Sequence, residues 1–268
     1  RIGTVAPEQL LYAAALIGQT PPRLAEAASE PFGARAVVYA VLLDTEDEVR
    51  RTQLAVLHAA GDEPCYRETI ALTPLVGQLP EEARLPLVER ACPALKQISP
   101  GQYDAFRKNV EALIKADARV NLLEYAIQAM LFRTLDVHFG LAKPPRIRYY
   151  ALRGVMEPLT TVLSTLAYAG QTGEDAVRKA FEAGVKEIDC QASLAAKGDC
   201  SLAAFDAALR ELAMAAPKVK GPVLAACAAC VTADGTVTVR EAELLRAVSS
   251  TLGCPMPPIG GQGLGIGD

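Results

Sequence analysis

Apolar residues recur at intervals of three and four along most of the chain, and this spacing constrains the fold more than any other feature of the sequence. It places apolar side chains on one face of an α-helix, whereas a strand would show a two-residue alternation. That alternation occurs only in GTVTV at 235–239, which is too short to indicate a sheet. Pro, Ser, Asp or Thr precedes several of the periodic stretches, as is typical of helix starts. We therefore predict an all-α fold.

The periodic stretches predict a helical array with one connecting segment, 138–148, and a Gly- and Pro-rich tail that we expect to be disordered over 260–268. We expect the second helix to be broken near Pro31. The expected helices span 6–17, 21–43, 46–60, 65–79, 81–97, 100–116, 122–136, 147–169, 173–188, 201–215, 218–232 and 239–252.

Net charge, cysteine content and the length of the apolar runs disfavour several classes of protein. A net charge of −4 and a pI near 5.4 disfavour a nucleic-acid binder, and we interpret the short basic run 143–148 as a solvated linker. Seven cysteines, an odd number, favour reduced and buried thiols, and we interpret the Cys227-x-x-Cys230 pair as helix packing. No apolar run reaches the roughly 18–20 residues that a membrane span needs, so we expect a soluble chain.

Two stretches come into register when the chain is shifted by 117 residues. LIKADARVNLLEYAIQAML (113–131) then lies over CVTADGTVTVREAELLRAV (230–248), and Pro100 lies over Pro217. The two stretches share the pattern Ala-Asp-x-x-Val-(Asn/Thr)-x-x-Glu, which favours an internal duplication over chance matching of helical periods.

The shared pattern has two interpretations. It resembles the second half of a calcium-binding loop, which makes Asp117, Glu124, Asp234 and Glu241 the candidate metal ligands. The positions of the strongest ligands in that loop are occupied by Cys230 and Thr232 in the second copy and by Leu113 and Lys115 in the first. A capping box, with Asn121 or Thr238 as the N-cap and a Glu three residues later, explains both copies without a metal, and we favour it.

The repeated unit resembles the TerB-like (tellurite-resistance B) helical domain. The second copy matches closely, whereas Ala118 and Arg119 replace the usual Gly and its neighbour in the first. Together with EPFGARAVVYAVLLD (30–44) and RRTQLAVL (50–57), the sequence also resembles the soluble C-terminal region of bacterial M48 (Ste24/HtpX-like) membrane zinc metallopeptidases. This resemblance predicts an N-terminal helical segment (1–63), two TerB-like repeats (64–140 and 141–259) and the tail (260–268).

The resemblance implies that the chain is the non-catalytic regulatory or protein-interaction part of a membrane-anchored zinc endopeptidase. Its partner would be its own peptidase and membrane domain or another protein, at the cytoplasmic face of the bacterial inner membrane. Zinc would belong to the peptidase domain, because neither His58 nor His138 lies in an HExxH motif. We expect no catalytic residue and no cofactor within the chain itself.

Two other hypotheses remain open at this point. The four acidic residues named above could make the chain a divalent-cation sensor of the TerB-like type. A solenoid of HEAT-like helix pairs would show a repeat of about 40 residues, whereas the repeat found here is 117 residues long.

Overall fold

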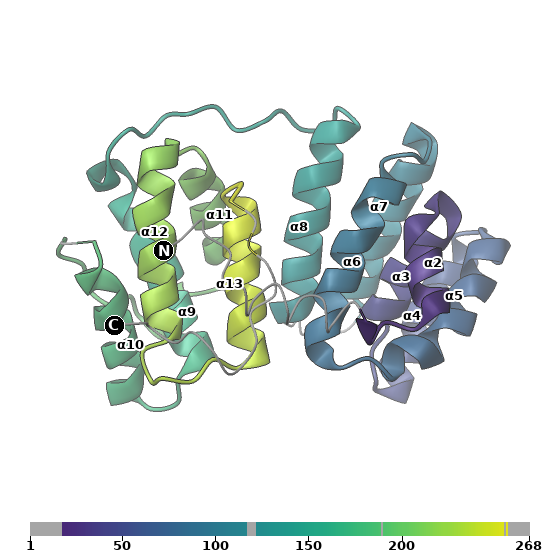
Figure 1. Cartoon of the computed structure of the whole chain (residues 1–268), viewed down its shortest axis with the longest axis horizontal. Helices are drawn as coiled ribbons and strands as arrows, with labels where there is room; N and C mark the ends of the chain where they lie inside the picture. Colours follow the sequence, from purple (N-terminus) through teal and green to yellow (C-terminus); the bar gives the residue numbers. More distant parts are fainter. Residues whose placement is uncertain (1–17, 117–121, 189, 255, 257–268) are drawn as a thin grey trace. The chain divides into compact units, whose positions relative to one another are not determined.

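The computed structural model describes residues 18–116, 122–188, 190–254 and 256 (Figure 1). Across these residues the chain forms twelve α-helices and two short 3-10 turns, and no strand is present. The only extended pairing in the described residues is an isolated bridge between Tyr149 and Ala215. The predicted all-α fold is confirmed.

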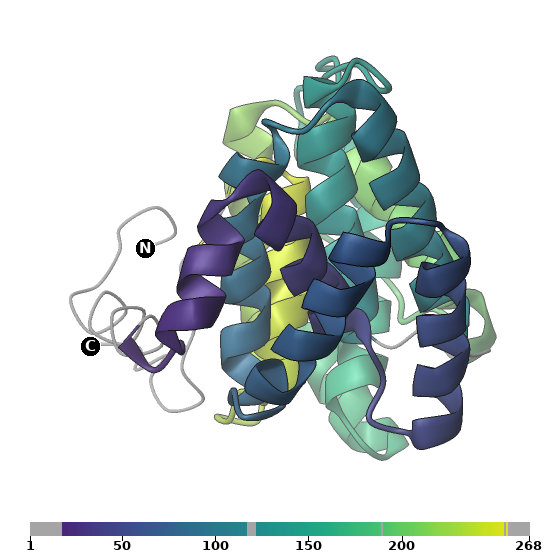
Figure 2. The ribbon, with the colours of Figure 1, turned by 90° about the vertical axis from the view of Figure 1, so that its right-hand side faces the viewer.

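The chain divides into two compact units, with the boundary between Lys143 and Pro144. The described helices of the first unit follow one another with short connections, and α2 lies beside α6 although the two are far apart in sequence (Figure 2). Their bounds are α2 Pro22–Ser29, α3 Pro31–Leu42, α4 Asp47–Ala59, α5 Glu63–Gly77, α6 Glu81–Leu95, α7 Pro100–Ile114 and α8 Leu122–His138.

Helix α3 is the centre of the first unit. Its sequence, PFGARAVVYAVL, is apolar on nearly every side, and ten of its twelve residues are buried. It packs against α2, α5, α6 and α7. At Gly33 the approach to α2 is so close that a Cβ would lie 2.5 Å from the carbonyl oxygen of Ala27.

The predicted break in the second helix is confirmed. Glu30 adopts an extended conformation (φ −115°, ψ 140°) between the end of α2 and Pro31, the first residue of α3. Proline disfavours helical geometry in the residue before it and has no backbone N–H to donate to the preceding turn. These two effects end α2 and start α3.

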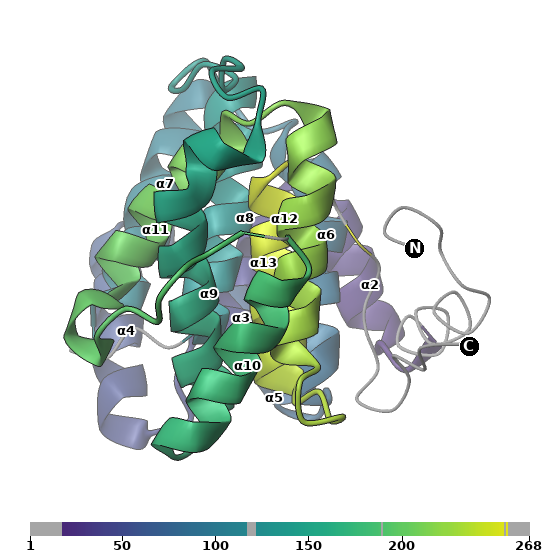
Figure 3. The ribbon, with the colours of Figure 1, turned by 90° about the vertical axis from the view of Figure 1, so that its left-hand side faces the viewer.

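The second unit is built around α9, as Figure 3 shows. This helix buries an almost continuous stretch from Val162 to Ala167 and packs against α10, α11, α12 and α13. The elements of the unit are η1 Leu152–Val155, α9 Met156–Gly170, α10 Glu174–Lys186, η2 Lys197–Asp199, α11 Leu202–Ala213, α12 Pro217–Val231 and α13 Val239–Thr251.

The prediction of one helix over 147–169 is wrong at its start. Residues 147–151 form no helix, and the helix begins at Met156 after the turn η1. The backbone N–H of Arg148 donates to the carbonyl oxygen of Met214 at 2.8 Å, and the N–H of Ala216 donates to that of Tyr149 at 2.8 Å. Because these bonds pair the backbone with distant residues outside a helix, the apolar period of the sequence does not determine the structure here.

The helix bounds follow the 117-residue shift found in the sequence. The shift carries Pro100–Ile114 (α7) onto Pro217–Val231 (α12), and it carries the start of α8 onto the start of α13. In the first unit α8 packs against α6 and α7, and in the second unit α13 packs against α11 and α12. The two stretches that share a sequence pattern therefore also share their helix bounds.

A buried glutamine joins three helices of the first unit. The Gln53 side chain on α4 is 1% exposed. Its Nε2 donates to the carbonyl oxygens of Leu42 at 3.0 Å and Leu113 at 3.1 Å, and its Oε1 accepts from the N–H of Asp44 at 2.7 Å. One amide thus bonds to backbone groups at the ends of α3 and α7, where helix carbonyls lack the usual partner four residues later; the carbonyl oxygen of Leu113 also accepts from the N–H of Ala116 at 3.3 Å.

We expect Gln53→Leu to destabilise the first unit by about 2–4 kcal/mol, because the carbonyl oxygen of Leu42 and the N–H of Asp44 lose their partner and the carbonyl oxygen of Leu113 loses one of its partners. The exposed Arg51 of the same helix supplies the matched control, Arg51→Ala, for which we expect a change within about 0.5 kcal/mol. Urea unfolding followed by circular dichroism measures both. Equal midpoints for the two variants would contradict the role assigned to Gln53.

Candidate functional site

The predicted capping box is present between α12 and α13. The Thr238 hydroxyl accepts from the backbone N–H of Glu241 at 3.2 Å, and the Glu241 Oε2 accepts from the backbone N–H of Thr238 at 2.8 Å. The Thr238 hydroxyl also donates to Glu241 Oε2, at 2.8 Å. The carboxylate of Glu241 is therefore engaged in starting α13.

Asp234 stabilises the turn before this cap. Its Oδ1 accepts from the backbone N–H of Thr236 at 2.9 Å and from the Thr236 hydroxyl at 3.0 Å, and its Oδ2 accepts from Gln171 Nε2 at 3.0 Å. The bond from Gln171 is the largest of the effects that lower the pKa of Asp234. Gly235 follows with φ +81°, a conformation that favours glycine. Both oxygens of this carboxylate are thus held within the junction.

The end of α9 completes the junction. Gly170 lies against the carboxylate of Glu241, so that a Cβ at this position would overlap Oε1. The next residue, Gln171, donates to Asp234. Sequence reasoning missed both residues, because neither belongs to a repeated pattern and the contacts join positions 71 and 63 residues apart. The carboxylates of Glu241 and Asp234 therefore both contact the end of α9.

The candidate acids of the first copy are placed differently. Asp117 and the predicted cap Asn121 lie outside the described residues. Glu124 is buried on α8, 6% exposed. It lines a cavity of about 100 Å³ at the end of α3. The lining residues are Val41, Leu42, Leu43, Asp44, Thr45, Arg84, Glu124 and Ile127.

The charges around this cavity do not favour a metal ion. Arg84 lines it together with Glu124, and the Arg84 Nε is buried without a hydrogen-bond partner among the described residues. A guanidinium beside a carboxylate competes with a metal cation for the negative charge. No group of three or more His, Cys, Asp and Glu side chains able to hold a metal occurs within the part of the chain that the structure describes. The structure therefore brings Asp234 and Glu241 into one junction, but not into a ligand set.

Cys227 and Cys230 are buried in α12. Burial raises the pKa of the Cys227 thiol and raises that of Cys230 to about 12. The Cys230 Sγ donates to the carbonyl oxygen of Leu163 on α9 at 3.6 Å. Metal binding and nucleophilic attack both require a thiolate, which these surroundings disfavour. All seven cysteines of the chain are free, but of the expected buried thiols only Cys65, Cys227 and Cys230 are buried, and the other four are half-buried.

Each of the two histidines lies near the end of a helix and contacts a neighbouring residue. His58 lies 3.8 Å from a carboxylate oxygen of Glu63 and is largely exposed. The Nε2 of His138 lies 2.8 Å from the carbonyl oxygen of Lys96. Neither is placed as a zinc peptidase motif would require, which is two His one helical turn apart.

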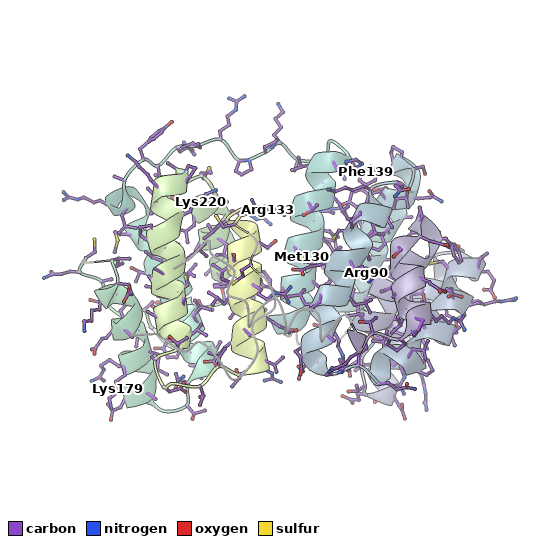
Figure 4. All side chains as sticks on the ribbon, in the orientation of Figure 1. Arg90, Met130, Arg133, Phe139, Lys179 and Lys220 are labelled. Atoms are coloured by element: carbon purple, nitrogen blue, oxygen red, sulfur yellow. The ribbon has the colours of Figure 1, made fainter. Side chains whose placement is uncertain are left out.

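A further polar cluster fixes the end of α8 against α7. The Tyr103 hydroxyl donates to Asp136 Oδ1 at 2.6 Å, and Arg107 Nε donates to the same oxygen at 3.1 Å. Phe139, labelled in Figure 4, stacks on the Tyr103 ring with the centroids 4.3 Å apart. Burial and the bond to Asp136 raise the pKa of the Tyr103 hydroxyl, which keeps it protonated as the donor. This cluster joins two helices.

Comparison with protein-family models, with curated proteins and with solved structures finds no match for this chain. In the part of the chain that the structure describes, no helix has both the length and the apolar character to cross a membrane.

We expect Gly170→Ala to destabilise the second unit by about 1–3 kcal/mol, because the new methyl group displaces the Glu241 carboxylate from the cap or forces α9 away. Gly221 in α12 is the matched control, since a Cβ there meets nothing within 4 Å. Gly221→Ala should stabilise the chain by about 0.5–1 kcal/mol. Thermal unfolding of both variants measures the change in stability. A change in the same direction in both variants would refute the contact at Gly170.

The pKa of Asp234 also gives a pH-dependent prediction. Because this pKa is lowered in the folded state, the carboxylate contributes stability above its ordinary pKa, and that contribution is lost as the pH falls through the folded value. Asp234→Asn should therefore lower the unfolding midpoint at about pH 7, and its difference from the unaltered chain should shrink below about pH 4. Urea titrations across this range test the prediction, which fails if the difference stays constant.

Proposed function

We propose that this chain is a non-catalytic helical module of a membrane-bound zinc metalloendopeptidase, and that it regulates the peptidase by binding its peptidase domain. The observation that carries the proposal is the junction between α12 and α13. Its Ala-Asp-Gly-x-Val-Thr-x-x-Glu sequence resembles the TerB-like motif, and each polar side chain of that motif has a structural contact in the junction: Asp234 in the turn, Thr238 as the cap and Glu241 as its reciprocal partner.

The chemistry of the described residues favours binding over catalysis. The carboxylates of Asp234, Glu241 and Asp136 accept hydrogen bonds that fix helix ends, and burial keeps Cys227 and Cys230 protonated. A general acid or base must instead reach a substrate with a proton to exchange. The helices thus form a scaffold on which a partner can be recognised by shape and charge.

Two measurements test the proposal. The coding sequence upstream of Arg1 should encode an HExxH motif flanked by apolar spans, and an unrelated upstream domain would overturn the family assignment. The peptidase part, reconstituted in nanodiscs, should bind the fluorescently labelled chain saturably and cleave a model peptide at a changed rate when the chain is added.

A folding control makes the binding result interpretable. Val162 on α9 is fully buried, so Val162→Asp should unfold the second unit. We expect this variant to lose any binding that depends on the second unit. Failure of the folded, unaltered chain to bind the peptidase part would overturn the proposal.

Calorimetry distinguishes the alternative, a divalent-cation sensor. The unaltered chain and Asp234→Asn are titrated with calcium, magnesium and zinc. A saturable heat of metal binding that the substitution abolishes would favour the sensor hypothesis. Flat traces at millimolar metal would rule that hypothesis out.

A further inference from the structure

The segment that enters the second unit, residues 144–155 (PPRIRYYALRGV), combines exposed cations with exposed apolar side chains. It contains Arg146, Arg148 and Arg153 and no acidic residue. All three arginines are exposed, and none forms an ion pair within the described residues. Ile147 is 48% exposed and Tyr150 is 63% exposed. We call this stretch the basic–apolar segment.

The exposure of these apolar residues is unusual within this chain. Only five large hydrophobic residues in the described part are exposed, and Ile147 and Tyr150 are two of them. A third, Leu141, precedes the segment in the chain. Scattered single apolar residues on a surface need no explanation, but their concentration in a short stretch rich in arginine indicates an interaction surface.

The backbone of the segment is held in place. The N–H groups of Arg148 and Tyr149 donate to the carbonyl oxygen of Met214, and the N–H of Ala216 donates to the carbonyl oxygen of Tyr149. Tyr149 also donates its hydroxyl to Glu211. Tyr149 is half-buried, whereas the side chains of Ile147, Arg148 and Tyr150 around it are exposed.

The same bonds bring a fourth cation to the segment. Because Ala216 is bonded to Tyr149, the start of α12 lies beside the segment. Lys218, in the first turn of that helix, is exposed and forms no ion pair among the described residues. Glu211, a carboxylate in contact with the segment, already accepts a hydrogen bond from Tyr149. The local charge is thus positive although the chain as a whole is acidic.

We propose that the basic–apolar segment, with Lys218, docks the chain on an anionic phospholipid surface. Arg146, Arg148, Arg153 and Lys218 contact headgroup phosphates. Ile147 and Tyr150 enter the boundary between headgroups and acyl chains. Peripheral proteins bind membranes through this combination of cationic attraction and shallow apolar burial.

Ile147 is the residue that favours lipid over other polyanions. An aliphatic side chain gains free energy when it leaves water for an apolar medium, and a nucleic-acid backbone offers none. Tyrosine is enriched at membrane–water interfaces, where its ring is buried and its hydroxyl stays hydrated. This docking does not depend on the proposed peptidase function, because it requires only the chain and a charged bilayer.

Vesicle sedimentation tests the proposal with the whole chain. Vesicles of phosphatidylcholine are compared with vesicles that also contain about one third phosphatidylglycerol. We expect binding to the anionic vesicles only, weakened by added salt because surface charges are screened. The triple substitution Arg146→Gln, Arg148→Gln and Arg153→Gln should lower the affinity about tenfold or more.

A matched control removes the same number of charges elsewhere on the second unit. Arg178, Lys179 (labelled in Figure 4) and Lys197 are exposed and unpaired in the described residues. Their replacement by Gln should change the affinity less than about twofold if local charge, and not net charge, governs binding. Thermal unfolding checks that both triple variants keep the fold.

Insertion is measured separately. The chain contains no tryptophan, so Tyr150→Trp supplies a single fluorescent reporter. Its emission should shift to the blue on anionic vesicles and should be quenched by brominated acyl chains. Ile147→Ser should reduce both effects.

Three outcomes would overturn the proposal. The first is equal binding to both kinds of vesicle, and the second is binding that the triple substitution at 146, 148 and 153 leaves unchanged. In the third, the folded chain does not bind vesicles but binds poly-glutamate through these arginines. That result would indicate that the surface recognises an acidic protein.

Discussion

Each unit of this protein depends on the burial of one helix that is apolar around most of its circumference. Such a helix is unstable alone in water, because no polar face remains to be hydrated. Helix α3 is covered by α2, α5, α6 and α7, and α9 is covered by α10, α11, α12 and α13. Most of the surrounding helices expose one side, as their alternating buried and exposed positions show. The central helix therefore determines where the others pack.

Because the surroundings of these helices are closely packed, polar groups buried there need hydrogen-bond partners within the protein. Ser164 on α9 is fully buried, and its hydroxyl accepts from the backbone N–H of Ala195 at 3.0 Å. Tyr39 on α3 accepts from Asn109 Nδ2 at 3.1 Å. Gln53 serves the ends of α3 and α7. An unpaired polar group in these positions would cost about 1–3 kcal/mol, so the side chains that pair them are as much part of the core as the leucines.

The sequence allowed most helices to be predicted, because their starts carry local signals. Ser99 caps α7 and Thr238 caps α13, and in both cases the sequence pattern alone is sufficient. It was not sufficient where distant residues decide the conformation. Residues 147–151 form no helix, because Arg148 and Tyr149 bond to Met214 and Ala216. Likewise, nothing local marks Gly170 as the residue that leaves room for the Glu241 carboxylate.

The same distinction between local and distant contacts explains what the acidic pattern does. A carboxylate can start a helix, hold a turn or bind a cation, and the residues that surround it decide which. Around Asp234 the donors are Gln171 and Thr236, and around Glu241 the donor is Thr238, so neutral hydrogen-bond donors of the protein occupy carboxylate oxygens that a cation would otherwise contact. Because these acidic side chains are engaged in maintaining helix geometry, the docking proposed above relies on side chains that are exposed and form no ion pair among the described residues. In the second unit the arginines of residues 144–155 meet that condition.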